Sequence, residues 1–395
     1  MNKQDLTLLT DLYELTMMQG YYKKGQHETV VFDVFYRHNP CGNGYSVCAG
    51  LDQVIDYIKN LNFTYEDVDY LRSLHIFDDD FLQYLSGFHF TGDIYAIPEG
   101  SVVFPKEPLL KVIAPIMEAQ LVETTILNLI NHQSLIATKT SRVVYAADGD
   151  GIMEFGLRRA QGPDAGLYGA RAAIIGGCVG TSNVLAGQLF DVPVMGTHAH
   201  SWIMTFPDEY TAFKYYAGLY PDNCTLLVDT YDTLKSGVPN AIRVFQEFKD
   251  AGKPLKKYGI RLDSGDLAYL SKKARKMLDE AGFPDASICA SNDLDEYLLH
   301  DLKAQGAAIN SWGVGTHLIT SKDCPSFGGV YKLSAIKNEN GEFIPKIKIS
   351  ENTEKITNPG NKTIYRVYEK ETGKIKADLI CFADETFDES QDLLL

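Results

Sequence analysis

The sequence predicts an α/β fold, with a (β/α) barrel in the middle of the chain and a smaller, discontinuous α+β domain built from its two ends. Three observations support this prediction. Six short apolar runs between residues 152 and 316 each end in a polar or glycine-rich cluster. Segments with helical period lie between most of them, as in repeated strand–helix units. The G-x-G-x-x-G fingerprint of an open dinucleotide-binding sheet is absent.

Each of the six runs has an apolar interior and reactive residue types at its end. The runs are residues 152–159, 192–201, 226–232, 258–266, 288–293 and 309–316. The segments with helical period between them are 165–189, 241–249 and 267–280. Parallel sheets hold ligands at the carboxyl ends of their strands, so the arrangement favours a barrel over an open sheet.

The N-terminal part of the chain has a different pattern. Leucines and methionines recur at spacings of three and four over residues 8–18, which predicts a helix that stops at Gly20. Alternation over residues 30–37 predicts a strand. Helical periodicity follows over 51–86 and 116–147, and a β-rich module with tight turns lies between them at 90–115.

The C-terminal part alternates in the manner of a β-meander over residues 329–380. We expect this meander to pack on the N-terminal part, which would make the smaller domain discontinuous. The sequence therefore predicts one domain from residues 1–120 with 325–395, and a barrel domain from residues 121–324 that carries the active site.

Composition argues against several classes of protein. Lys plus Arg number 37 and Asp plus Glu number 52, and the net charge of −15 argues against a nucleic-acid binder. The longest nearly apolar stretch, 172–179, is far shorter than the ~20 residues that span a bilayer, so no membrane segment is expected. Residues 1–5 are polar and acidic, so we expect no secretory signal. Seven cysteines without a C-x-x-C pair predict thiols in a reducing, cytoplasmic compartment.

The first cluster that could carry chemistry is 154–159, where an aromatic ring, a glycine and two arginines end an apolar run. Arginine binds carboxylates and phosphates through two parallel hydrogen bonds, so Arg158 and Arg159 predict an anion site. The alternative is an ordinary surface salt-bridge pair. The turn residues at 161–164 that follow favour the functional interpretation.

Two further clusters contain hydroxyls, glycines and histidines. Residues 176–183, with Thr181 and Ser182, suit anion binding at a helix start, although glycines also serve helix packing. In the next loop, His198 and His200 could bind a metal, act as a general base or accept a phosphoryl group. The spacing does not support a closed zinc site. One structural and one solvated histidine is the alternative.

Carboxylates close two of the later runs. Asp229 and Asp232 follow the third run, and Asp263 follows the fourth, beside Arg261. Carboxylates on adjacent parallel strand ends could hold Mg²⁺ that is shared with phosphate oxygens. A salt-bridge network on the barrel rim is the alternative.

Glycines follow the last run. Residues 313–316 (GVGT) are a candidate phosphate loop on a late barrel strand. Residues 358–363 (NPGNKT) lack the G-x-x-x-x-G-K frame, so we interpret them as a turn. Together, the arginines, hydroxyls, carboxylates and glycine loops of one rim predict a site for a multi-phosphate substrate with Mg²⁺.

Six motifs resemble those of the nicotinate phosphoribosyltransferase family and occur in that family's order. They are 11–17 (DLYELTM), 154–166 (EFGLRRAQGPDAG), 180–187 (GTSNVLAG), 196–201 (GTHAHS), 261–266 (RLDSGD) and 312–316 (WGVGT). The resemblance covers most of residues 5–370. It implies the type II phosphoribosyltransferase fold, an irregular seven-stranded α/β barrel of the (β/α)7 type with a smaller domain built partly from the N-terminus.

The resemblance also implies an activity, the first step of NAD salvage from nicotinate. Nicotinate and 5-phosphoribosyl-1-pyrophosphate (PRPP) would give nicotinate mononucleotide and pyrophosphate, with Mg²⁺ and with ATP as a co-substrate, but with no prosthetic group. ATP hydrolysis would drive the reaction through a phosphohistidine at His200. Phe155 and Tyr13 would sandwich the pyridine ring, with Tyr13 supplied by the neighbouring subunit of a homodimer.

Further roles are implied for the residues that match the motifs. Arg158 and Arg261 would bind the phosphates or the substrate carboxylate. Asp229 and Asp263 would bind Mg²⁺ or the ribose hydroxyls, and Asp263 would be catalytic together with His200. The other residues expected to bind substrate are Thr181, Ser182, Ser201, Asp293, Gly313, Gly315 and Thr316.

Ser182 bears on the choice of substrate. Related enzymes that use nicotinamide carry an Asp directly after the Gly-Thr pair, where it accepts a hydrogen bond from the amide. A carboxylate at this position would repel nicotinate, whereas a hydroxyl can donate to it. The sequence therefore favours the acid over the amide as substrate.

Two alternatives stay open at this point. One is a nicotinamide- or quinolinate-type phosphoribosyltransferase on the same barrel, and the other is an inactive binding homologue that lacks a C-terminal segment. Members of the family usually continue well beyond this length with further C-terminal segments, whereas this sequence stops at the leucines at 393–395. A shortened end and a divergent end are both open interpretations of this departure from the family pattern.

Overall fold

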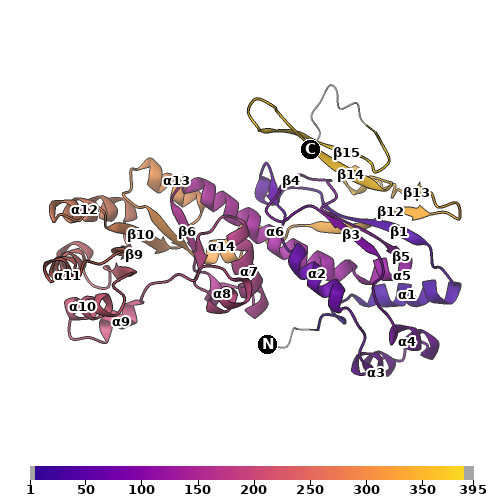
Figure 1. The fold of residues 1–395 in the computed structure, drawn as a ribbon, viewed down its shortest axis with the longest axis horizontal. Helices are drawn as coiled ribbons and strands as arrows, with labels where there is room; N and C mark the ends of the chain where they lie inside the picture. Colours follow the sequence, from indigo (N-terminus) through magenta and orange to yellow (C-terminus); the bar gives the residue numbers. More distant parts are fainter. Residues whose placement is uncertain (1–4, 387–395) are drawn as a thin grey trace. The chain divides into compact units, whose positions relative to one another are not determined.

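The chain consists of two compact units, which the computed structural model describes over residues 5–386 (Figure 1). The first unit comprises residues 1–135 and 326–395, and the second comprises residues 136–325. The second unit is thus inserted into the first along the sequence.

The break between the units lies inside the long helix α6 (Glu123–Ala146). The sequence pattern places this break at 120/121 and the return at 324/325. The expectations about the first four residues and about the leucines at 393–395 lie outside the described residues.

The first unit is built on a five-stranded antiparallel sheet. Its central strand β1 (Thr29–Tyr36) pairs with β5 (Leu110–Pro115) on one side. On the other side it pairs with β12 (Gly329–Lys337), from the C-terminal part of the chain. The strand order is β13 (Phe343–Pro345), β12, β1, β5 and β3 (Asp93–Ala96). Every residue of β1 after its first is buried, so this strand runs through the core of the unit.

Smaller elements complete the first unit. Two two-stranded sheets are formed by β2 (Ser46–Val47) with β4 (Val102–Val103) and by β14 (Lys362–Tyr368) with β15 (Ile375–Phe382). The helices, besides the first part of α6, are α1 (Leu12–Lys24), α2 (Leu51–Asn60), α3 (Tyr65–Ser73), α4 (Asp79–Leu85) and α5 (Ile116–Leu121), with short 3₁₀ turns at Pro40–Gly42 and Thr353–Lys355. Helix α3 begins where Thr64 and Asp67 exchange side-chain and backbone hydrogen bonds as a capping box.

Helix α1 differs from its predicted bounds at both ends. It begins after Asp11 and continues through Gly20 to Lys24, so the predicted stop at Gly20 is wrong. A single glycine costs a helix interior only about 1 kcal/mol. The helix ends instead at Gly25, whose φ of 70° is left-handed and suits a residue without Cβ.

The second unit contains a curled, half-barrel sheet of six parallel strands, which confirms the predicted α/β class. Its strand order is β7 (Gly180–Thr181), β6 (Gly151–Glu154), β11 (Ser311–Val314), β10 (Ser287–Asn292), β9 (Tyr258–Leu262) and β8 (Cys224–Leu227). A single parallel bridge from Thr181 to Val194 adds a seventh segment beside β7. All six carboxyl ends therefore lie on the same edge of the sheet.

Helices follow the strands in the order expected for repeated βα units. They are α7 (Pro163–Ile175), α8 (Val184–Phe190), α9 (His200–Met204), α10 (Glu209–Leu219), α11 (Val238–Asp250), α12 (Leu267–Glu280), α13 (Glu296–Ala304) and α14 (Thr316–Ile319), with a 3₁₀ turn at Leu157–Arg159 and a short π-helix at Thr233–Gly237. Helix α12, for example, packs against β9 and β10.

Two predictions for this unit need correction. The single helix predicted over 165–189 is two helices separated by β7, because α7 ends at the glycine pair before Cys178 and Gly177 has a φ of 109°. The run at 192–201 forms only the Val194 bridge, and its last two residues begin the helix α9 at His200.

The alternation of side chains along the strands separates the core from the site. Ile260 and Leu262 of β9 are fully buried, whereas Arg261 between them lines a cavity. The same holds in β11, where Trp312 and Val314 are fully buried and Gly313 lines that cavity. Among the described residues, the helices are all too short or too polar to cross a membrane.

Candidate active site

A cavity of about 700 Å³ lies at the carboxyl ends of the parallel strands of the second unit. It is lined by Phe155, Leu157, Arg158, Arg159, Ser182, Gly196, Thr197, His198, Ala199, His200, Ser201, Leu227, Arg261, Asp263, Ser291, Asn292, Asp293, Gly313, Gly315 and Thr316. Most of the predicted site residues are therefore brought together by one edge of one sheet, as expected for parallel strands.

The Phe155 ring is seated against a glycine. A Cβ atom on Gly313 would lie 2.6 Å from Cδ2 of Phe155, so no larger residue fits there without moving the ring. The Phe155 backbone is held as well, because its N–H donates to the carbonyl of Val314 at 2.8 Å. The aromatic face is thus fixed at the end of β6.

A buried carboxylate lies directly before this ring. Glu154 is fully buried, and it accepts hydrogen bonds from the Gly156 N–H and, at 2.6 Å, from the Thr181 hydroxyl. Burial raises the pKa of Glu154, and these two hydrogen bonds oppose that rise. The Thr181 hydroxyl is therefore used inside the protein and does not line the cavity, whereas Ser182 next to it does.

Arg158 and Arg159 are the available cations of the cavity. Both lie on the 3₁₀ turn after β6 and are exposed. Neither makes a hydrogen bond or an ion pair to the part of the chain that the structure describes. The alternative of a surface salt-bridge pair therefore has no support, and two guanidinium groups face the cavity without a counter-ion.

Arg261 is organised differently, because each of its three side-chain nitrogens donates a hydrogen bond. Its Nε donates to Ser291 Oγ, its Nη1 to Thr197 Oγ1 and its Nη2 to Asp263 Oδ1, each at 2.7 Å. Burial opposes ionisation of Asp263, but the Ser291 hydrogen bond and the Arg261 charge hold the pKa of this carboxyl below its usual range. Asp263 is therefore an anion at neutral pH, and Arg261 fixes its orientation.

The two histidines of the GTHAHS loop have different surroundings. His198 is buried, its Nε2 accepts from the Leu227 N–H at 3.3 Å, and burial lowers its pKa to about 4. His200 is half-exposed at the start of α9, with Nδ1 at 3.0 Å from the Thr230 hydroxyl and Nε2 at 3.7 Å from Asp263 Oδ2. His200 is therefore the histidine that a substrate can reach.

The carboxylates suit a divalent cation only as a pair. Asp229 Oδ2 accepts from the Asp263 N–H at 2.8 Å and from the Ser264 hydroxyl at 2.6 Å, while its buried Oδ1 has no partner. Groups of three or more metal-binding side chains do not occur between residues 5 and 386. Two carboxylates fit Mg²⁺, which usually takes one or two of them together with substrate phosphate oxygens. Asp232 is a different case, because it caps the Thr233–Gly237 turn through the Lys235 N–H.

Tyr13 belongs to α1 of the first unit and is not among the residues that line the cavity. Its neighbour Glu14 is fully buried and accepts from the Thr124 N–H at 2.9 Å, which ties α1 to the start of α6. Tyr13 itself is 44% exposed, beside the exposed Leu9 and Leu12. The ring is available for contact with another molecule.

Several contributors were not predicted as site residues. Thr197 and Ser291 orient Arg261, and Thr230 contacts His200. Alternation along the run at 288–293 could have pointed to Ser291, since it precedes Asp293 by two residues. Asn292 has a φ of 130°, a strained value for a residue with a side chain, and the sequence carries no signal for it.

Comparisons with known proteins agree with this geometry. Residues 8–131 match the nicotinate phosphoribosyltransferase (NAPRTase) N-terminal domain, and residues 151–372 match the NAPRTase family. The chain is 52% identical to the nicotinate phosphoribosyltransferase of Bacillus subtilis over 389 residues, which cover 98% of this chain and 78% of the relative. It is 34% identical to that of Homo sapiens, over 96% of this chain and 80% of the relative.

Solved structures give the same result. The crystal structure of human nicotinic acid phosphoribosyltransferase superposes with a TM-score of 0.82 at 31% identity, covering 96% of this chain and 82% of the other. A nicotinate-nucleotide pyrophosphorylase from Pyrococcus furiosus, 23% identical over 98% of this chain and 86% of the other, shares the fold with a TM-score of 0.73. The chain therefore belongs to the nicotinate phosphoribosyltransferase family.

Proposed function

We propose that the chain joins nicotinate to PRPP and forms nicotinate mononucleotide and pyrophosphate. One observation carries this proposal: a fixed aromatic ring, two unpaired arginines and an ionised aspartate line the same cavity. The ring suits a planar pyridine, the arginines suit phosphate or carboxylate groups, and the aspartate suits a positively charged ribose. A relative named nicotinate phosphoribosyltransferase, from Bacillus subtilis, is 52% identical to the chain.

In the proposed reaction, the pyridine nitrogen forms a bond to C1 of the ribose while the bond from C1 to the pyrophosphate oxygen breaks. The leaving pyrophosphate takes the electron pair. Arg158 and Arg159 would neutralise the charge that grows on it, and Asp263 would stabilise the cation-like ribose carbon. Asp229 and Asp263 would hold Mg²⁺, which supplies further positive charge to the phosphates. Asp293 and the glycines at 313 and 315 line the same cavity, and they would hold the ribose and its 5-phosphate.

We further propose that ATP hydrolysis is coupled through His200. The half-exposed imidazole of His200 would accept the γ-phosphoryl group as a bond from nitrogen to phosphorus forms and the bond from phosphorus to ADP breaks. The new negative charge would lie close to Asp263, whose carboxylate is 3.7 Å from Nε2. Repulsion between them would loosen the contact of Asp263 with Arg261, which is one way for phosphorylation to change substrate affinity.

We propose a homodimer in which Tyr13 reaches the cavity of the partner. The exposure of Tyr13 next to apolar residues on α1 supports this, because such a strip is normally covered by protein. Mixed dimers test the idea. Subunits with Tyr13→Ala and subunits with His200→Ala should each be weakly active alone, and co-expression should restore activity in about a quarter to a half of the sites. Failure to regain any activity, with mixed dimers shown to form, would contradict shared sites.

The central experiment measures product from nicotinate, nicotinamide and quinolinate with PRPP and Mg²⁺, in the presence and absence of ATP. We expect turnover of nicotinate alone, stimulated by ATP, with label from [γ-³²P]ATP on the wild type and none on His200→Ala. Preference for another pyridine would contradict the substrate, and absence of any turnover would favour the inactive homologue. The cysteine pattern supports a cytoplasmic location, which cell fractionation can test.

A further inference from the structure

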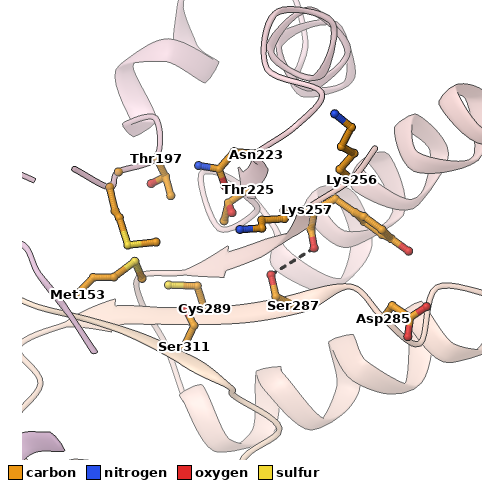
Figure 2. Close-up of a pocket in the computed structure, with 13 residues that line it drawn as sticks. Met153, Thr197, Asn223, Thr225, Lys256, Lys257, Asp285, Ser287, Cys289 and Ser311 are labelled. Atoms are coloured by element: carbon orange, nitrogen blue, oxygen red, sulfur yellow. Dashed lines mark hydrogen bonds between the residues drawn. The ribbon is translucent and has the colours of Figure 1, made fainter. Parts of the chain in front are cut away.

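A second cavity, of about 350 Å³, lies inside the same curled sheet toward the amino-terminal ends of its strands (Figure 2). It is lined by Met153, Met195, Gly196, Thr197, Asn223, Thr225, Lys256, Lys257, Tyr258, Asp285, Ser287, Cys289 and Ser311. Only Gly196 and Thr197 also line the active-site cavity. The volume lies at the lower end of the range of pockets that bind small molecules.

Three hydrogen-bond donors without partners meet at one part of this cavity. Lys257 and Asn223 come directly before the paired strands β9 and β8, and Thr225 lies in β8. The side chains of all three make no hydrogen bond or ion pair to residues 5–386. Figure 2 shows the Lys257 side chain directed into the cavity, beside Thr225 and Cys289. An ammonium, an amide N–H₂ and a hydroxyl form a donor set for an anion.

The neighbouring lysine is arranged differently, although it lines the same cavity. Lys256 Nζ forms an ion pair with Asp222 Oδ1 at 2.9 Å. In Figure 2 its side chain points away from Lys257. The cavity therefore has one cation that lacks a counter-ion, and the two adjacent lysines form a natural pair of test and control positions.

The remaining walls restrict the kind of anion. Met153, Met195 and Cys289 provide apolar surface, so the cavity suits a ligand with an apolar body. Asp285 also lines the cavity. One free ammonium cannot neutralise both this carboxylate and the several charges of a polyanion, so nucleotides and pyrophosphate are disfavoured. The chemistry thus fits one negative charge on a small apolar molecule.

We propose that this inner cavity is a binding site for a small organic monocarboxylate, held by Lys257, Asn223 and Thr225. The site is distinct from the substrate cavity, and a ligand in it touches Thr197, whose hydroxyl accepts from Arg261 on the other side. The proposal concerns binding and holds whether or not the chain has the proposed activity.

Equilibrium dialysis with ¹⁴C-labelled hexanoate tests the proposal on the full chain without PRPP or ATP. We expect one saturable site per chain that excess pyrophosphate does not empty, because the inner cavity disfavours polyanions whereas the unpaired arginines of the other cavity suit them. Hexanamide and the dianion adipate should compete weakly. Lys257→Met should weaken binding about 10- to 100-fold, the effect of losing a charged hydrogen bond, and Lys256→Met should leave it nearly unchanged.

Thr225→Val offers a second variant that keeps the side-chain shape and removes one donor. We expect a several-fold loss of hexanoate binding in this variant as well, with thermal unfolding unchanged. Absence of saturable binding to the wild type, equal binding by Lys257→Met, or displacement of hexanoate by pyrophosphate would each overturn the proposal.

Discussion

Replacing Gly313 by alanine tests whether the seat of the Phe155 ring determines catalysis. The new Cβ would lie 2.6 Å from one ring carbon and 2.7 Å from another. The first distance is 0.8 Å shorter than 3.4 Å, where ordinary van der Waals contact begins. The Phe155 backbone is held by its hydrogen bond to Val314, so the ring must turn into the cavity. A displacement of roughly 1 Å at a substrate-positioning group costs about 100-fold in kcat/KM, or about 2.7 kcal/mol.

The assay is steady-state formation of nicotinate mononucleotide with each substrate varied in turn. We expect the loss of kcat/KM for nicotinate, while the Tm changes little because the ring moves into open space. Gly218→Ala is the matched control, since its Cβ would meet only Phe248, at 4.0 Å. A Gly313→Ala enzyme with unchanged kcat/KM for nicotinate would refute the role of the seated ring.

Three further changes probe substrate choice and stability. Ser182→Asp should lower the ratio of kcat/KM for nicotinate to that for nicotinamide by about 100-fold, because the new carboxylate would repel that of nicotinate. An unchanged ratio would show that the pyridine ring of the substrate does not bind beside residue 182. Lys362→Met should lower the free energy of unfolding in urea by roughly 3–5 kcal/mol, because it leaves Asp33 buried without its 2.7 Å ion-pair partner, and adding Asp33→Leu should recover much of the loss. The pKa of His198 is about 4 in the folded chain, below its ordinary value of 6.5, so the unfolded chain binds a proton first as the pH falls. The free energy of unfolding is therefore unaffected by this residue above pH 6.5 and falls by roughly 3 kcal/mol as the pH approaches 4. His198→Gln should remove that part of the pH dependence, and an identical profile would show that other groups cause it.

The sequence allowed most of the active-site cavity to be predicted, for a simple geometric reason. Parallel strands end on one edge, so reactive residues at the ends of separate apolar runs must meet. Phe155, Arg158, Asp263 and Asp293 follow the ends of three different strands and line one cavity. This meeting of side chains can be predicted without knowing which strands pair or which residues are buried.

The failures have equally specific causes. The two-residue strand β7 is too short to produce an apolar run, so its segment was predicted as helix. Thr181 has the residue type of an anion ligand, but its hydroxyl is used by the buried Glu154, a contact between residues 27 positions apart. Two partners of Arg261 likewise come from distant parts of the chain, Thr197 from a loop and Ser291 from β10. Periodicity describes neighbours along the chain, and such contacts depend on tertiary packing.

The pairing of β1 with β12 determines which of the two units can fold first during synthesis on the ribosome. Val30 pairs with Ile336 in the sheet, so it cannot find this partner until the ribosome has added about 300 further residues. The inserted second unit is complete by residue 325 and can fold first, since domains fold as units during translation. Until then the buried, apolar β1 has an open edge, which is the kind of surface that joins to other chains. Aggregation during expression should therefore depend on how fast residues 326–337 follow the rest, rather than on the stability of the finished enzyme.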